Sequence, residues 1–322
     1  MLNVQSKVIN IVKDFDWRQY IVYIAFVLLF IYFAVTLSNE GFLTTNNLMN
    51  IARQTAMISI MGVAMTFVIA SKEIDLSVGS VAALSAITTA LTMQAGLGMI
   101  TAVIVGLATG LLIGFINGYL VTKIAIPSFL VTLAMMMIAR GLAMWISGTA
   151  PIPISSESYI FLFGSGDILG IPILLVWTLI IAVLGHFVLR KTTFGRQTLA
   201  AGGNETAATF SGIRTMKIKM TVFMVSGMAA ALAGMLYAGR LHAGRFTFGQ
   251  GDELSVIAAV ILGGTSLFGG VGTVVGTIFG SIMIGTINNA LILQGLDVSQ
   301  QQVIQGIIII LAVAFGRKKK KA

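Results

Sequence analysis

Residues 71–80 read SKEIDLSVGS, a short polar segment between two long apolar runs. Lys72, Glu73 and Asp75 bring three charges close together, and a charged side chain at the middle of a bilayer costs roughly 2.5–3.5 kcal/mol. The segment therefore lies either in a turn at the edge of a membrane or in a polar site inside it. A similar sequence, DELSV, recurs at residues 252–256, again before an apolar run.

The composition indicates a membrane protein. Hydrophobic residues make up 57% of the 322 residues and charged residues 10%, whereas soluble domains carry about 25% charged residues. A membrane-spanning helix needs about 20 mostly apolar residues, and the chain offers roughly ten such runs. Their apolar character is continuous, unlike the alternating pattern of barrel strands. We therefore predict an all-α, polytopic membrane protein with about ten transmembrane helices.

The predicted spans cover, in chain order, residues 20–37, 51–70, 77–95, 99–121, 126–147, 171–189, 220–239, 254–268, 272–293 and 298–316. They form a transmembrane domain at 20–316, between a cytoplasmic N-terminal segment at 1–19 and a basic cytoplasmic tail at 317–322. An N-terminus inside the cell puts most of the 20 Lys and Arg residues on the cytoplasmic side, as the positive-inside rule requires. The net charge of +9 therefore reflects membrane orientation, with contact to anionic lipid as a further use of the tail, and does not indicate nucleic acid binding.

Two sequence matches indicate an inverted repeat. The segments at 75–78 and 253–256, DLSV and ELSV, precede spans that run in opposite directions. IGFINGYL at 113–120 resembles IGTINNAL at 284–291, again in spans of opposite direction. We predict two five-helix halves of inverted topology, an arrangement typical of transport proteins with a pathway near the repeat interface. Chance similarity between apolar segments is the alternative.

Several kinds of chemistry have no residues to support them. The chain has no cysteine and two histidines far apart, His186 and His242, which argues against a metal site and a histidine-based triad. No G-x-x-x-x-G-K-[ST] motif is present, and the glycine-rich residues 263–270 are predicted to form a tight turn. No cofactor is therefore expected in this chain. Arg140 is predicted to snorkel outward from its span, with pairing to a buried acid or lining of a pathway as the alternatives.

The polar stretch 190–219 is predicted to be a cytoplasmic loop that contains a short helix at 205–211. Asn204 is a good N-cap, Glu205 suits the first turn and Gly212 is a good stop signal. So short a helix is marginal on its own, which points to a partner surface. An ordinary solvated connector is the alternative.

Three separated motifs resemble the permease subunits of bacterial monosaccharide ABC importers of the ribose type. They are EIDLSVGS at 73–80, AGGNETAATFSGI at 201–213 and AAVILGGTS at 258–266. The resemblance covers nearly all of residues 40–316. Its first motif includes Glu73, Asp75, Leu76, Ser77 and Gly79. Ser71, Lys72 and Glu73 stand where many relatives have glycines, so the sequence does not name the sugar.

The resemblance implies a second permease copy, ATPase subunits that carry ATP and Mg, and a periplasmic or lipid-anchored sugar-binding protein, in the bacterial inner membrane. The residues that match the family's ATPase-coupling helix are Gly203, Asn204, Glu205, Ala208, Ser211 and Gly212. Candidate pathway residues, chosen for their place in the repeat, are Ser77, Asn117, Asn288 and Asn289. The alternatives are an ion-coupled secondary symporter and a permease of the same family for a branched-chain amino acid or a signalling sugar.

The topology places residues 71–80 at the cytoplasmic start of the third span. We therefore predict that Glu73 and Asp75 serve in a cap and turn, with Leu76, Ser77 and Val78 nearer the pathway. An Asp75 deep in the membrane would instead favour the symporter, because such transporters place a carboxylate mid-span.

Overall fold

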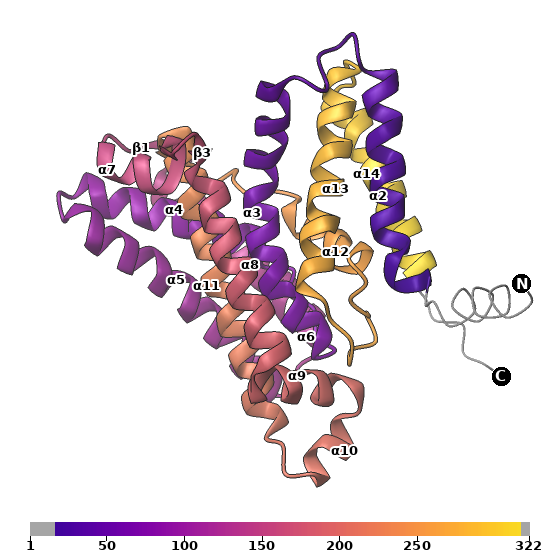
Figure 1. Cartoon of the computed structure of the whole chain (residues 1–322). Helices are drawn as coiled ribbons and strands as arrows, with labels where there is room; N and C mark the ends of the chain where they lie inside the picture. The colour runs from indigo at the N-terminus through magenta and orange to yellow at the C-terminus, as the bar shows by residue number, and fades with distance from the viewer. Residues whose placement is uncertain (1–16, 317–322) are drawn as a thin grey trace, which may run out of the picture.

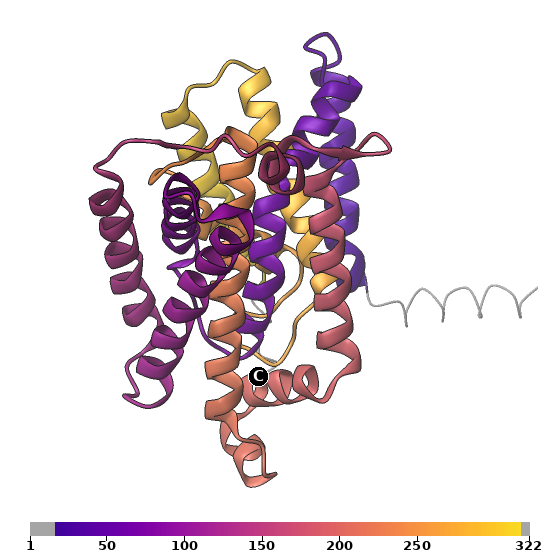
Figure 2. The same ribbon diagram turned by 90° about the vertical axis from the view of Figure 1, so that its left-hand side faces the viewer.

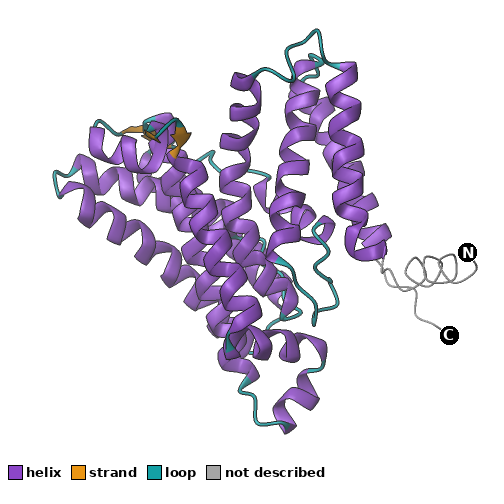
Figure 3. Cartoon of the chain, in the orientation of Figure 1, coloured by secondary structure: helices purple, strands orange, loops and turns teal. Residues whose placement is uncertain are grey.

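The computed structural model describes residues 17–316, and the predictions for 1–16 and for the tail 317–322 lie outside this range (Figure 1). The chain is almost entirely helical, which confirms the predicted all-α class (Figure 3). The helices are α2 (Trp17–Thr36), α3 (Thr45–Ala70), α4 (Val78–Gln94), α5 (Gly98–Thr122), α6 (Ser128–Ser147), α7 (Glu157–Ile160), the π-helical turn η1 (Phe161–Ser165), α8 (Ile173–Lys191), α9 (Thr193–Gly203), α10 (Glu205–Phe210), α11 (Thr215–Leu241), α12 (Asp252–Leu262), α13 (Val274–Leu293) and α14 (Val298–Gly316).

Two small antiparallel strand pairs lie in the connecting loops. β1 (Ile152–Pro153) pairs with β4 (Ala243–Gly244), and β2 (Asp167–Ile168) pairs with β3 (Ile171–Pro172). These loops and α7 lie at one end of the helix bundle, here called the α7 end (Figure 2). α9 and α10 lie at the opposite end, the α10 end (Figure 1).

Each of the predicted spans overlaps one helix of the described structure. In the part of the chain that the structure describes, six helices are long and apolar enough to cross a bilayer: α3, α5, α6, α8, α11 and α13. α12 has 11 residues, or about 17 Å of helix, which is about half of a hydrocarbon core. The eighth span, predicted at 254–268 as short and interrupted by glycines, is indeed short, and it ends earlier because the helix stops before Gly263 and Gly264, the latter at a φ of +91° that favours glycine. Broken helices of this kind occur in membranes where protein buries the exposed backbone.

The helix packing follows the predicted inverted repeat. α5 packs along α11, and its counterpart α13 packs along α3. α4 contacts both α5 and α6, just as α12 contacts both α13 and α14. α3 and α11 contact each other at the centre of the bundle. The first helix of each half departs from this pattern, since α8 packs on α3 whereas α2 packs on α13.

The α5–α11 contact depends on a row of glycines. Gly106, Gly110, Gly114 and Gly118 recur at every fourth position and therefore share one face of α5. A Cβ added to Gly110 or Gly114 would collide with backbone carbonyls of α11. Small residues at such spacing allow helix backbones to approach closely in a membrane. The glycines thus bring α5 against the buried α11 without a layer of side chains between them.

Candidate functional site

The α10 end contains two helices outside the long bundle. The side chain of Asn204 accepts a hydrogen bond from the N–H of Ala207 at 3.0 Å, and Gly212 follows the helix with a φ of +83°. The predicted short helix is confirmed, one residue shorter, as α10. The preceding helix α9 was not predicted, although Thr192 gives a cap signal by accepting from the N–H of Gly195 at 3.3 Å.

The predicted coupling residues lie along α10 and just beyond its two ends. Ala208 is buried, whereas the others are exposed: Gly203, Asn204, Glu205, Ser211 and Gly212. Next to them, α9 touches the end of α3 so closely that a Cβ on Gly202 would collide with the carbonyl of Ala70. Gly270 of the glycine-rich turn also donates to that carbonyl, at 2.9 Å. The α10 end is therefore connected by backbone contacts to the segment that begins at residue 71.

Residues 71–77, here called the connector, join α3 to α4 and enclose a buried carboxylate. Asp75 is 1% exposed. Its Oδ1 accepts from the N–H and the hydroxyl of Ser77 at 2.9 and 2.6 Å, and its Oδ2 accepts from Ser226 at 2.8 Å. The amide of Asn117 donates to the Ser77 hydroxyl at 3.0 Å. Four polar side chains from the connector, α5 and α11 therefore form one buried network.

Asp75 is buried inside the helix bundle and does not lie at its surface, and its carboxylate holds the turn that starts α4, as predicted. Its partner Ser226 lies within α11, seven residues beyond Lys219, which is about 10 Å along the helix. Glu73 remains near the end of the bundle, where its Oε1 lies 2.8 Å from the Lys219 ammonium. The three charges of this segment thus have different surroundings, with Lys72 exposed.

The helices are interrupted at two places, here called breaks: the connector before α4, and the segment 242–251 before α12. The side chain of Arg140 binds the second break. The guanidinium of Arg140 donates to the carbonyls of Phe246 and of Phe248, the latter at 2.7 Å. The prediction that Arg140 snorkels outward is wrong, because these acceptors draw it into the bundle. The local sequence gives no sign of this contact, since the acceptors lie 106 and 108 residues further along the chain.

The two breaks meet inside the bundle. A Cβ on Gly79, at the start of α4, would collide with the carbonyl of Gly249. Beside this contact, Tyr237 donates to the carboxylate of Asp252 at 2.7 Å. The starts of α4 and α12, which carry the related DLSV and ELSV sequences, are therefore held in one polar region.

The predicted pathway residues do not come together as one group. Ser77 and Asn117 share the buried network described above. Asn289 instead exchanges two hydrogen bonds with Asn47, at 2.9 and 2.8 Å. Asn288 accepts from the amide of Gln305 at 2.9 Å. In the described structure all four side chains bind protein partners.

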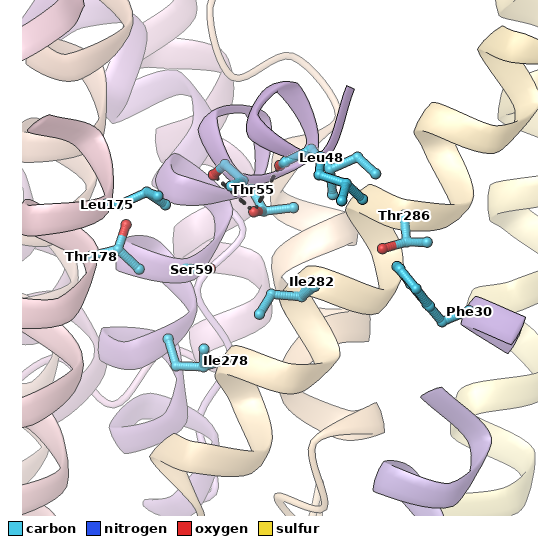
Figure 4. Close-up of a pocket in the computed structure, with 11 residues that line it drawn as sticks. Phe30, Leu48, Thr55, Ser59, Leu175, Thr178, Ile278, Ile282 and Thr286 are labelled. Atoms are coloured by element: carbon cyan, nitrogen blue, oxygen red, sulfur yellow. Dashed lines mark hydrogen bonds between the residues drawn. The ribbon is translucent and has the colours of Figure 1, made fainter. Parts of the chain in front are cut away.

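A cavity of about 180 Å³ opens between α2, α3, α8 and α13 (Figure 4). Most of the lining residues are apolar, such as Phe30, Leu48, Leu175 and Ile282. Four hydroxyl residues also line the cavity, and the hydroxyl of Thr286 has no hydrogen-bond partner among the described residues; the four are Thr55, Ser59, Thr178 and Thr286. Sugar hydroxyls need several polar partners, so this apolar space does not suit a sugar.

The fold and these two breaks define a class: a polytopic membrane permease with broken helices and an external pair of helices. Residues 47–313 match the family described as "Branched-chain amino acid transport system / permease component", and the chain belongs to this family. It is 43% identical over 286 residues to the ribose import permease protein of Bacillus subtilis strain 168, covering 88% of this chain and 89% of the relative. No solved structure matches the chain.

Two relatives from Escherichia coli strain K12 extend the comparison. The ribose import permease protein is 39% identical over 290 residues, covering 89% of this chain and 90% of the relative. The L-arabinose transport system permease protein is 38% identical over 306 residues, covering 95% and 92%. The predicted resemblance is confirmed: the chain is a multi-pass ABC importer permease subunit and not itself an enzyme. Membership of this family argues against the ion-coupled symporter, although Asp75 is buried within the bundle.

Proposed function

We propose that the chain is the transmembrane subunit through which an ATP-driven importer moves ribose or a similar monosaccharide across a bacterial inner membrane. The observation that carries this proposal is the 43% identity to a ribose import permease over nearly nine-tenths of both chains. The similarity to an L-arabinose permease supports a monosaccharide as the class of cargo. The family description also names branched-chain amino acids, which makes them the alternative cargo.

The α10 end is the proposed docking site for separate ATPase subunits, which would carry ATP and Mg. The capped helix α10 stands clear of the bundle, and the proposed coupling residues lie within it and just beyond its two ends. This orientation places both chain termini in the cytoplasm, in agreement with the positive-inside rule. The basic tail would then lie beside anionic lipid.

The α7 end is the proposed docking site for an external sugar-binding protein. The β1–β4 pair joins the loop that follows α6 to the loop that follows α11, so the two loops present one continuous surface. Two permease copies, which we propose form a homodimer, would complete the sugar pathway and move between inward-open and outward-open states. We propose that the segments before α4 and α12 lie nearest this pathway.

Reconstitution in proteoliposomes tests the proposal. The permease, the ATPase and the binding protein encoded beside it would be assayed with radiolabelled ribose, arabinose or leucine. We expect ribose uptake that requires ATP and the binding protein, and none with a catalytically inactive ATPase. Preferential leucine uptake would support the amino acid alternative. Uptake by the permease alone under an ion gradient would contradict the proposal.

A further inference from the structure

Lys219 binds two carboxylates that belong to different parts of the molecule. Its ammonium lies 2.8 Å from Oε1 of Glu73 in the connector and 2.7 Å from Oε2 of Glu205, the first residue of α10. The side chains of Lys219 and Glu73 are only 13% and 11% exposed. Water therefore screens this pair less than it screens an ion pair on an open surface.

The connector is attached to α11 at two points. Glu73 binds Lys219, and two residues later Asp75 binds Ser226 at 2.8 Å. Lys219 and Ser226 are seven residues apart, so they lie on the same face of α11. The connector consequently follows one side of α11 over two helical turns. A displacement of its Glu73 end would be transmitted to the buried network that contains Ser77.

We propose that Lys219 is the joint through which movement of α10 reaches the connector and the start of α4. This inference rests on the proposed function, in which α10 receives the motion of an ATPase. Lys219 acts here as a positioning residue, because it holds Glu205 and Glu73 together. When the ATPase displaces α10, Glu205 moves with it. Because the same ammonium group binds both carboxylates, the displacement is transmitted through Lys219 to Glu73.

A role in membrane orientation alone does not account for this geometry. The positive-inside rule requires a positive charge and no particular partner. Lys217 supplies the same charge two residues earlier on the same helix, is exposed, and forms no ion pair among the described residues. Lys217 is therefore the matched control for Lys219.

The test uses the complete importer in proteoliposomes and compares Lys219→Met, Lys219→Arg and Lys217→Met with the wild type. Three quantities are measured: the ATPase that co-purifies with the permease, the ATP hydrolysed, and the ribose imported per ATP. For Lys219→Met we expect normal co-purification and an about tenfold loss of ribose imported per ATP, within the usual range of coupling between two sites. Lys219→Arg should restore most of this ratio, and Lys217→Met should leave it unchanged.

A second pair of variants keeps the proposal testable if Lys219→Met does not fold. Each of these variants, Glu73→Gln and Glu205→Gln, removes one of the two ion pairs of Lys219 and leaves the lysine in place. Because either change breaks the same connection, the double variant should lose no more coupling than the more impaired single variant. Additive losses, or a wild-type ratio in a folded Lys219→Met, would overturn the role of Lys219. A wild-type importer without ATP-driven uptake would instead overturn the proposed function.

Discussion

Replacing Asp75 with alanine should strongly destabilise the permease, because the carboxylate is the acceptor for three buried donors. It accepts from the backbone and the hydroxyl of Ser77 and from Ser226. A buried donor left without a partner costs about 1–3 kcal/mol. The two hydroxyls can rotate toward other acceptors, whereas the backbone N–H cannot, so we expect a total loss of about 3 kcal/mol. This is a large share of a typical stability of about 5–15 kcal/mol.

Asp75→Asn separates the need for an acceptor from the need for a charge. The amide oxygen can still accept from Ser77, and the Ser226 hydroxyl can turn to accept from the new NH₂ group. We expect a loss of about 1 kcal/mol and ATP-driven uptake close to that of the wild type. Thermal unfolding in nanodiscs measures stability, and uptake in proteoliposomes measures function. Glu40→Ala, which removes an exposed carboxylate in the loop between α2 and α3, is the control.

Two results would refute this reasoning. An Asp75→Ala variant as stable as the wild type would show that the network contributes nothing to folding. An Asp75→Asn variant that folds normally but transports nothing would show that the negative charge itself is required, as in an ion-coupled carrier.

Three further predictions concern packing and the second break. Gly114→Ala should lower the melting temperature of the permease, since its Cβ would meet backbone atoms of α11, whereas Gly141→Ala, which has open space, should not. Asn47→Ala and Asn289→Ala, compared singly and together by unfolding in detergent, should show a coupling of about 0.6–1.7 kcal/mol; strictly additive effects would contradict a direct pair. Arg140→Gln should speed tryptic cleavage in the 242–251 segment by releasing the carbonyls that Arg140 binds; an unchanged cleavage rate would contradict this restraint.

Local sequence signals predicted the features that depend on neighbouring residues. The apolar runs located the spans, and Asn204 and Gly212 located the ends of α10 because caps act within a few residues of a helix terminus. The inverted repeat was readable because both halves kept similar sequences at the starts of α4 and α12.

Features that depend on distant partners could not be predicted in this way. Asp75 is buried in the bundle, where its carboxylate accepts a hydrogen bond from Ser226, 151 residues away in the sequence. The inward turn of Arg140 depends on carbonyls more than 100 residues away. Lys219 looked like any other positive charge beside a span, since its two carboxylates come from separate segments.

The row of glycines on α5 has a mechanical consequence for transport. Because the backbones of α5 and α11 are in direct contact, there are no flexible side chains between them that could rearrange. The two helices should therefore move together as one rigid unit. α12 and α13 meet in the same manner, at Gly263 with Gly276 and at Gly280 with Ala259. The helix α3 lies between the α5–α11 unit and the α12–α13 unit. It meets α13 through side chains such as Thr66 and Thr277, whose hydroxyl oxygens are 2.8 Å apart. We expect the side-chain contact between α3 and α13 to deform more easily than the backbone contacts within the two units. The bundle can therefore flex at this contact as it opens to one side of the membrane and then the other.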